Sequence, residues 1–386
     1  MSTTIESFAH VLRRTIVYPL LRLVFRNSVS TSSIDLQNVQ RLLLFRYDRI
    51  GDMIITTPIL RILKQQNPSL RLDVLASRAN AEIIQENRFV DHVVVLETNW
   101  FRLFRQVLDL RRQNYDVLLN FIFNRTTGPA ILANLIAPHG QKVGQGPDRY
   151  AFYFNRLVKL RRYDQHMLLS YLEMVEQTFG TRIDPDELRY ELSVDKDSKL
   201  IVDHWLTTTS LRRKAEDQGD SVWYVVLNPA GKDPERSIGV QHAAALIKDL
   251  SREQSFQLVV LESPDNKAMI RAFREKQVLK NCLVYRTLGP KPLAELASLI
   301  EGAIAVITPD TSIVHFASAM QTAVLALYNE QKASVEWLPW NVLCEEVHLE
   351  RDGTINDLEP KLLLEKTRNF ISKALKARPS TARGNK

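Results

Sequence analysis

A short stretch near the amino terminus joins the pattern of a buried strand to that of a helix: Leu42-Leu-Leu-Phe-Arg-Tyr-Asp-Arg-Ile-Gly-Asp-Met-Ile-Ile-Thr-Thr-Pro-Ile-Leu60. Its first apolar residues are typical of a strand in a parallel sheet, and Gly51-Asp52 marks the turn into the helix. Apolar β-rich runs and helical patterns then alternate, which indicates a parallel sheet flanked by helices. The strands predicted in this half are Arg41–Tyr47, Leu70–Leu75, His92–Leu96 and Tyr115–Phe121, and helices are predicted to begin near Met53, Arg78 and Trp100.

The second half of the chain repeats this alternation. Two such sheets predict an α/β protein made of two doubly wound domains, which bind ligands at the carboxyl ends of their strands. We therefore expect a cleft where the two carboxyl edges face each other. Between about residues 149 and 220 the strand pattern stops, and we expect only helices and a polar connector there. The strands predicted in the second half are Val222–Leu227, Gln257–Leu261, Leu283–Tyr285, Ala303–Ile307 and Val324–Leu327, with helices from Gln241, Asp265, Pro292 and Ile313.

Composition agrees with a two-domain protein. With 386 residues and 45% hydrophobic composition, the chain has enough apolar material for two cores. The predicted units are, in order, a basic amphipathic segment over residues 1–35, a Rossmann-like domain over 36–190, a linker over 191–220, a second Rossmann-like domain over 221–350, a helix over 351–376 and a disordered basic tail over 377–386.

Charge and cysteine content narrow the kinds of partner. The formal net charge of +7 favours anionic partners such as nucleotides or phosphorylated glycolipids. Because the excess is small and no nucleic-acid module is present, we expect no nucleic-acid partner. The 2 cysteines, Cys282 and Cys344, form no C-x-x-C pair, so neither a metal-thiolate site nor a disulfide framework is expected, and a reducing cytosol is the default compartment.

The most apolar part of the amino-terminal segment, residues 11–26, is interrupted by arginines and a proline. It is therefore too short to span a bilayer, which takes roughly 18 apolar residues or more. Its arginines lie between apolar pairs, which fits two interpretations. The segment either lies on an anionic membrane surface or packs against the body of the protein.

Asp52 has two possible roles. It lies in the first turn of the predicted helix, where a carboxylate acts as an N-cap and is kept ionised by the helix dipole. An ionised carboxylate at a cleft edge is also what a general base needs in order to deprotonate a hydroxyl. The neighbouring Arg46 and Arg49 are either surface charges or contacts to a phosphate of the acceptor, and Gly51 either permits the turn or allows close approach of another group.

Two loops of the second half have the composition of anion-binding turns. Val226-Leu-Asn-Pro-Ala-Gly-Lys-Asp-Pro-Glu-Arg236 follows a strand, and its amides with Lys232 or Arg236 suit a diphosphate, although a plain surface loop has the same composition. Thr308-Pro-Asp-Thr-Ser312 opens a small-residue helix, and at least one of its polar residues is expected to cap that helix. Neither a P-loop nor a G-x-G-x-x-G pattern occurs, which disfavours a nucleotide hydrolase or a dinucleotide-dependent enzyme.

Three motifs together resemble glycosyltransferase family 9, the ADP-heptose:lipopolysaccharide heptosyltransferases. They are Arg-Ile-Gly-Asp with Thr-Pro shortly after it, the Asn-Pro-Ala-Gly loop, and Thr-Pro-Asp-Thr-Ser-x-x-His-x-Ala-x-Ala, in an order that matches over about residues 40–345. The resemblance implies a GT-B fold, with two Rossmann-like domains facing across a cleft. It further implies an inverting glycosyltransferase that needs no metal or cofactor and moves heptose from ADP-heptose to the lipopolysaccharide inner core.

The resemblance also implies roles for single residues. Asp52 matches the family's catalytic base, and the implied acceptor is the lipopolysaccharide core on lipid A, met at the cytoplasmic face of the inner membrane by a cytoplasmic, peripheral enzyme. The residues on the acceptor side are Arg46, Arg49 and Gly51, and those on the nucleotide-sugar side are Asn228, Gly231, Lys232, Arg236, Asp310, Thr311, Ser312 and His315.

Several positions depart from the family pattern. Ser312 stands where glycine is usual, and Glu235 stands where a phosphate-contacting lysine is usual, so Arg236 or Lys232 would supply the positive charge. The loops Glu262-Ser-Pro-Asp-Asn266 and Asn329-Glu-Gln-Lys332 differ as well. The sequence therefore leaves open a member that uses another nucleotide-sugar, or an inactive relative that binds a nucleotide or a glycolipid.

Overall fold

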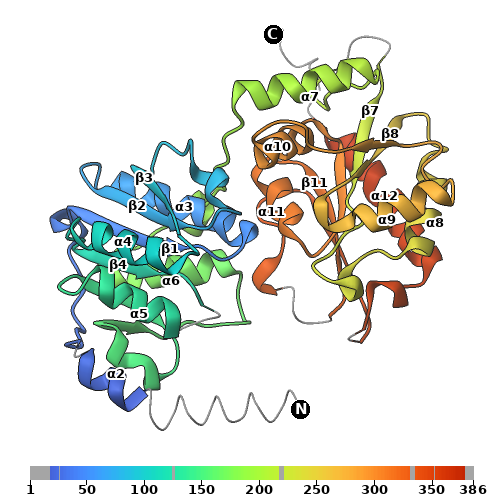
Figure 1. The fold of residues 1–386 in the computed structure, drawn as a ribbon. Coiled ribbons are helices and arrows are strands. Elements are labelled where there is room, and N and C mark those ends of the chain that lie inside the picture. Colours follow the sequence, from blue (N-terminus) through green and yellow to red (C-terminus); the bar gives the residue numbers. More distant parts are fainter. Residues whose placement is uncertain are drawn as a thin grey trace.

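The computed structural model describes residues 18–25, 27–123, 127–216, 221–330, 335–351 and 353–378. Two sheets with flanking helices form two halves that lie next to each other (Figure 1). Parts of all six predicted units lie outside the described residues: 1–17 and 26 of the amphipathic segment, 124–126 of the first domain, 217–220 of the linker, 331–334 of the second domain, 352 of the helix segment and 379–386 of the tail.

The first sheet has six parallel strands in the order β3-β2-β1-β4-β5-β6. β1 lies in the middle, and its residues from Leu42 to Arg46 are all buried, as expected for a strand covered on both faces. The strands are β1 Arg41–Arg46, β2 Arg71–Ala76, β3 His92–Val95, β4 Val117–Asn120, β5 Gln141–Gln145 and β6 Arg156–Val158.

The second sheet repeats the same topology. Its six parallel strands run in the order β12-β11-β10-β7-β8-β9, which is the order of the first sheet read from the other edge. This is the strand order of dinucleotide-binding folds, in which the order of the strands reverses beside the first strand. The strands are β7 Trp223–Leu227, β8 Phe256–Leu261, β9 Leu283–Tyr285, β10 Ala305–Pro309, β11 Ala323–Tyr328 and β12 Cys344–His348.

Helices cover both faces of each sheet. In the first half, Leu43 and Phe45 of β1 face α4 and α5, whereas Leu42 and Leu44 face α3 and α6. Side chains alternate between the two faces of a strand, so both faces of β1 carry core residues. The helices are α2 Tyr18–Val24, α3 Ile50–Gln66, α4 Trp100–Arg111, α5 Thr127–Ile136, α6 Met167–Phe179, α7 Lys196–Thr208, α8 Val240–Leu250, α9 Lys267–Glu275, α10 Pro292–Gly302, α11 Ser312–Ala319 and α12 Pro360–Ala377.

The structure corrects the predicted elements at five places. The helix α5 and the strands β5, β6 and β12 were not predicted, and β6 lies in the region expected to lack strands. These strands are short, and β5 and β12 are rich in polar residues, so their apolar pattern is weak. The helix expected near Arg78 is a single 3₁₀ turn, η3 Ala81–Ile84.

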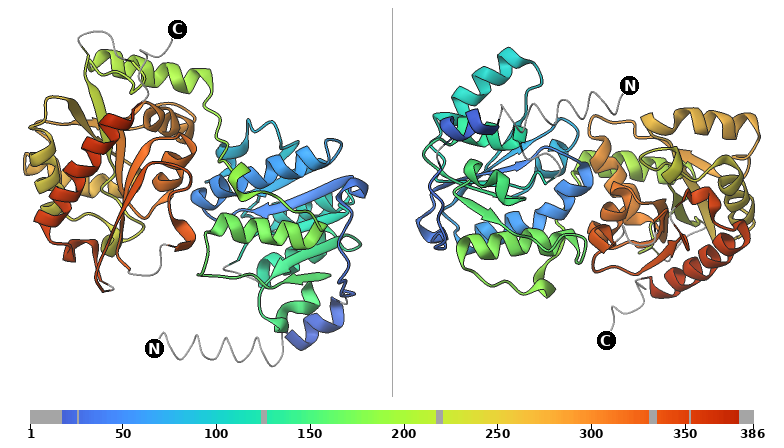
Figure 2. Two further views of the ribbon diagram at one scale, coloured as in Figure 1. Left: turned by 180° about the vertical axis from the view of Figure 1, so that it is seen from behind. Right: turned by 90° about the horizontal axis from the view of Figure 1, so that it is seen from below.

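The two halves meet through close contacts. α3 packs against α11, and the guanidinium of Arg162 donates to both carboxylate oxygens of Glu336 at 2.6 and 3.1 Å. The indole of Trp340 donates to the carbonyl of Leu188 at 2.8 Å. The predicted linker contains α7, which packs on α10 of the second half. Seen from behind and from below, the halves touch along α3 and α11 while their sheets stay separate (Figure 2).

The described end of the amino-terminal segment packs on the first half. Leu21 and Phe25 lie against Tyr153, whereas Leu20 and Leu23 of α2 are exposed. The packing interpretation of the segment is therefore confirmed for this part of it. No helix among the described residues is both long and apolar enough to cross a membrane.

Candidate active site

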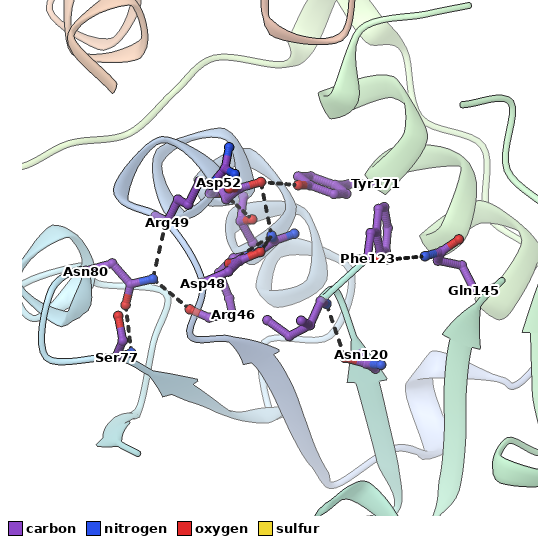
Figure 3. Close-up of polar contacts among 12 residues, drawn as sticks. Arg46, Asp48, Arg49, Asp52, Ser77, Asn80, Asn120, Phe123, Gln145 and Tyr171 are labelled. Atoms are coloured by element: carbon purple, nitrogen blue, oxygen red, sulfur yellow. Dashed lines mark hydrogen bonds and ion pairs between the residues drawn. The ribbon is translucent and has the colours of Figure 1, made fainter. Parts of the chain in front are cut away.

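A buried asparagine holds the turn between β1 and α3. Asn80 Nδ2 donates to the carbonyl oxygens of Arg46, at 2.9 Å, and of Arg49, at 3.4 Å (Figure 3). Its Oδ1 accepts the amide of Ser77. Residues 46–52 therefore project from a fixed turn at the carboxyl edge of the first sheet, where ligands bind in this fold class.

Asp52 lies in the first turn of α3 and is buried. The hydroxyl of Tyr171, from α6, donates to its Oδ1 over 3.1 Å (Figure 3). The N-cap interpretation of Asp52 is wrong, because Arg49 occupies the cap position and Asp52 accepts no backbone amide from the described residues. Its Oδ2 accepts no hydrogen bond from that part of the chain either, so it remains available to a further donor.

Arg46, the last residue of β1, is buried with 1% of its surface exposed. Its Nη1 lies 2.9 Å from Asp48 and 3.4 Å from Asp52, and its guanidinium stacks 4.5 Å above the ring of Tyr171. The surface-charge interpretation of Arg46 is therefore wrong. The guanidinium is enclosed by two carboxylates and aromatic rings, so its immediate effect is on Asp52; contact with an acceptor phosphate stays a prediction.

The environment of Asp52 makes it a stronger base than an ordinary aspartate. Burial raises its pKa to about 6, and the neighbouring charge of Asp48 acts in the same direction. Arg46, the Tyr171 hydrogen bond and Arg49 oppose this rise. The helix dipole was expected to keep Asp52 ionised; burial raises its pKa in spite of the dipole, but not above neutral pH. A pKa of about 6 leaves the carboxylate mostly ionised at neutral pH and able to accept a proton.

Gly51 lies where the two halves touch. A Cβ atom at this position would stand 2.7 Å from Cδ2 of His315, which is closer than such atoms approach. His315 is buried, and burial lowers its pKa to about 3, so it is neutral at physiological pH. The structure therefore brings Gly51 and His315 into contact at the junction; their binding to acceptor and donor stays a prediction.

Arg49 is exposed and lies between the two carboxyl edges. Its charge lowers the pKa of both Asp52 in the first half and Asp310 in the second. One cation therefore influences carboxylates of both sheets, which places the two edges close together across the junction.

The carboxyl ends of β7 and β10 are tied together. Asn228 Nδ2 donates to Oγ1 of Thr308 at 3.0 Å and to Oγ1 of Thr311 at 3.4 Å. Thr311 is the N-cap of α11, as expected for one of the polar residues there, and Ser312 is the first residue of that helix. The amide of Gly231 donates to Ser237, so this amide is already engaged within the loop.

Arg236 is surrounded by carboxylates. Its Nη2 lies 3.2 Å from Glu330 and its Nη1 lies 3.5 Å from Asp310, whereas Lys232 is exposed. Burial raises the pKa of Asp310, and Arg236 and Arg49 counteract it. The described residues hold no group of three or more His, Cys, Asp and Glu side chains that would bind a metal ion.

Sequence reasoning overlooked three of these residues. Tyr171 lies 119 positions from Asp52, on a helix that was read only as connector. Asp48 lies within the first motif but was given no role, and Glu330 was noted only as a departure from the family pattern. The charge pattern Arg46-Tyr-Asp48-Arg49-Ile-Gly-Asp52, with two carboxylates and two cations at one turn, was the one available signal.

Comparison with known proteins identifies the family. The model for glycosyltransferase family 9 (heptosyltransferase) matches residues 100–363. The chain belongs to this family of glycosyltransferases. Lipopolysaccharide heptosyltransferase 3 of Escherichia coli strain K12 is 23% identical over 309 residues, which cover 75% of this chain and 82% of that protein. A "putative glycosyltransferase" of Haemophilus influenzae is 22% identical, covering 78% of this chain and 87% of that protein.

Solved structures of the family share the fold. A glycosyl transferase family 9 protein of Veillonella parvula superimposes with a TM-score of 0.72 at 14% identity, covering 88% of this chain and 99% of that one. The E. coli ADP-heptose lps heptosyltransferase II superimposes with a TM-score of 0.68 at 19% identity, covering 86% of this chain and 99% of that one. The predicted GT-B fold of two Rossmann-like domains is confirmed.

Proposed function

We propose that this family 9 enzyme transfers heptose from ADP-heptose to the lipopolysaccharide inner core, with inversion at the anomeric carbon and without a metal ion. The observation that carries the proposal is Asp52, a buried carboxylate with a pKa of about 6 and one oxygen without a hydrogen-bond partner among the described residues. Relatives named as lipopolysaccharide heptosyltransferase 3, and a structural neighbour named as an ADP-heptose heptosyltransferase, support the choice of donor and acceptor.

In the proposed reaction Asp52 takes the proton of the acceptor hydroxyl. The acceptor oxygen forms its bond to the anomeric carbon as the bond from that carbon to the diphosphate breaks, and ADP leaves with both electrons. A single displacement of this kind inverts the anomeric carbon. Arg46 and Tyr171 hold the carboxylate in place, and the exposed Arg49 beside it would contact a phosphate of the acceptor.

The donor loop would neutralise the charge of the leaving diphosphate. Arg236 and the exposed Lys232 supply the positive charge in this proposal, and the amino end of α11, with Asp310 to Ser312, supplies amides and hydroxyls. Arg236 would then exchange Glu330 for phosphate oxygens when the donor binds. Because this charge is provided by side chains, we propose that no metal ion is required.

The acceptor sets the proposed location of the enzyme. Lipopolysaccharide core is carried on lipid A, which is a membrane lipid, so the enzyme would act from the cytoplasm at the inner face of the inner membrane.

A transfer assay with defined donors tests the proposal. The purified protein is incubated with heptose-deficient core acceptor and with ADP-heptose, ADP-glucose or UDP-glucose, in the presence and absence of EDTA. We expect ADP release and a product larger by one heptose only with ADP-heptose, unaffected by EDTA, with the opposite anomeric configuration by NMR. A retained configuration, or complete loss of transfer with EDTA, would refute the proposed mechanism.

A relative that binds a nucleotide-sugar without turning it over is the second candidate. The contacts of Arg236 with Asp310 and Glu330 favour it, because carboxylates already occupy the cation that a diphosphate would need. Calorimetric titration separates the two functions. An enzyme gives a heat of binding with ADP-heptose and a further heat of reaction once acceptor is added. A protein that only binds gives the heat of binding alone.

A further inference from the structure

The helix α4 carries apolar side chains on its exposed side as well as on its packed side. Trp100 is 77% exposed and Phe104 is 59% exposed, and Leu108 and Phe101 are exposed beside them. Residues 100, 104 and 108 recur every four positions, so they form one stripe along the helix. Only Leu110 of α4 is fully buried. Large exposed aromatic residues grouped on one helix mark a binding surface.

Four arginines lie on or beside this stripe. Arg102, Arg105, Arg111 and Arg112 are all exposed, against the single acidic residue Asp109, which pairs with Arg112 at 2.8 Å. Arg105 lies over the ring of Phe101 at 4.6 Å, so cation and aromatic ring form one surface.

The groove between α4 and the edge strand β3 adds a further arginine to the same surface. Arg71 lines it together with Arg102 and Arg105. Of the acidic groups there, Asp73 is buried and bonded to Arg71, and Glu97 lies 3.8 Å from Arg78. The exposed charge of this face is therefore positive.

We propose that α4 docks the protein on an anionic lipid bilayer, with Trp100, Phe101 and Phe104 inserted at the level of the headgroups. A helix with aromatic residues on one stripe and arginines beside it is the form that lies in a membrane interface, and positive charge selects anionic lipids. Such a bilayer matches both the apolar and the charged parts of the face.

The position of α4 in the fold suits this role. α4 and α5 cover the face of the first sheet opposite α3, the helix that contacts α11 (Figure 1). Docking through α4 therefore leaves the junction between the two halves uncovered. Leu135 of α5 is also exposed, and so are Leu20 and Leu23 of α2, which is attached to the same half.

Vesicle binding of the full-length protein tests the proposal without donor or acceptor. Flotation is measured with phosphatidylglycerol/phosphatidylethanolamine vesicles and with phosphatidylcholine vesicles. We expect Trp100→Ser/Phe104→Ser to weaken binding to anionic vesicles by about tenfold or more. Arg102→Gln/Arg105→Gln should weaken it less and reduce its sensitivity to salt. The matched control is Leu200→Ser/Leu288→Ser, which changes residues 64% and 69% exposed in the second half and should bind like the wild type.

Three outcomes would overturn the proposal. The first is that the Trp100/Phe104 variant binds vesicles as the wild type does. The second is that vesicle binding is lost only when residues 1–17 are deleted. The third is a wild-type dimer in light scattering that the same variant abolishes, because a second copy would then be the occupant of the α4 face. The vesicle test and the transferase test can fail independently of each other, because transfer to a delipidated core oligosaccharide does not involve α4.

Discussion

Asp52 and Asp73 are two buried carboxylates of the first half, and each has a tyrosine hydroxyl and an arginine beside it. Asp73 accepts a 2.7 Å hydrogen bond from Tyr115 and two 3.2 Å bonds from the guanidinium of Arg71. From the described residues Asp52 accepts one hydrogen bond, that of Tyr171, and it shares Arg46 with a second carboxylate. The same residue types thus form a satisfied network in one place and an incomplete one in the other.

The incomplete network lies where chemistry is expected. Asp73 is the third residue of β2, in register with Leu43 in the middle of the sheet, whereas Asp52 follows the carboxyl end of β1. Burial is the main cause that makes Asp52 hold a proton more tightly, and the charge of Asp48 adds to it against the opposing charges of Arg46 and Arg49. A buried carboxylate with a raised pKa and an unfilled oxygen is suited to accept a proton.

The largest expected effect is on catalysis. Replacing Asp52 by Asn keeps the shape of the side chain but removes the base, and we expect kcat to fall by about 10²- to 10⁴-fold, the usual contribution of a positioned base. Asp73→Asn, the matched change in the satisfied network, should leave the kcat of folded protein unaltered. Initial rates of ADP release under saturating donor measure both. Equal losses in the two variants would remove the distinction between the two carboxylates.

The next effect concerns stability and pH. The pKa of Asp52 is raised in the folded protein from 3.8 to about 6, so the folded form binds this proton more tightly than the unfolded chain. The wild type therefore loses stability as pH rises from about 4 to about 6, by up to about 3 kcal/mol. Asp52→Asn lacks this loss and leaves Arg46 with one carboxylate, Asp48. We expect the variant to gain stability relative to wild type over this pH range, measured by urea denaturation at pH 4.5, 6 and 7.5.

Asp73→Asn should act in the opposite direction. The neutral amide cannot accept the bonds of both Tyr115 and Arg71 as the carboxylate does, and Tyr115 is buried. We expect a loss of about 1–3 kcal/mol in the free energy of unfolding at pH 7. Urea denaturation measures it, and a stability equal to that of the wild type would show that the satisfied network contributes little.

The sequence predicted the strands with clear apolar runs better than the short or polar strands. The strands that lie inside each sheet, such as β1 and β10, have long apolar runs because helices cover both of their faces. β6 and β12 are edge strands, and β5 next to β6 is largely polar. Whether these segments form strands of the sheet therefore depends on their pairing with residues that are distant in sequence. Pairing of that kind leaves no periodic pattern in one sequence.

The site was predictable only where its residues are neighbours in sequence. Asp52 and the Thr311 cap follow from strand-to-helix turns, whose residue preferences are local. The burial of Arg46 was not predictable, because it depends on Tyr171, which the fold brings from α6. Likewise, the contact of Gly51 with His315 depends on how the two halves pack, and neither residue shows it alone.

The smallest expected effect tests how Tyr171 tunes the base. Its hydrogen bond lowers the pKa of Asp52, so Tyr171→Phe should raise that pKa further above its value of about 6 while keeping the ring that stacks on Arg46 and Phe121. Because the ionised carboxylate is the active form, kcat/KM rises with pH, and its inflection should move upward by up to about 1 unit. Transfer would then fall several-fold at pH 6 and little at pH 8. Tyr115→Phe, the same change beside Asp73, should leave the inflection in place, and a shift of equal size there would mean that overall stability, not the hydrogen bond to Asp52, controls the profile.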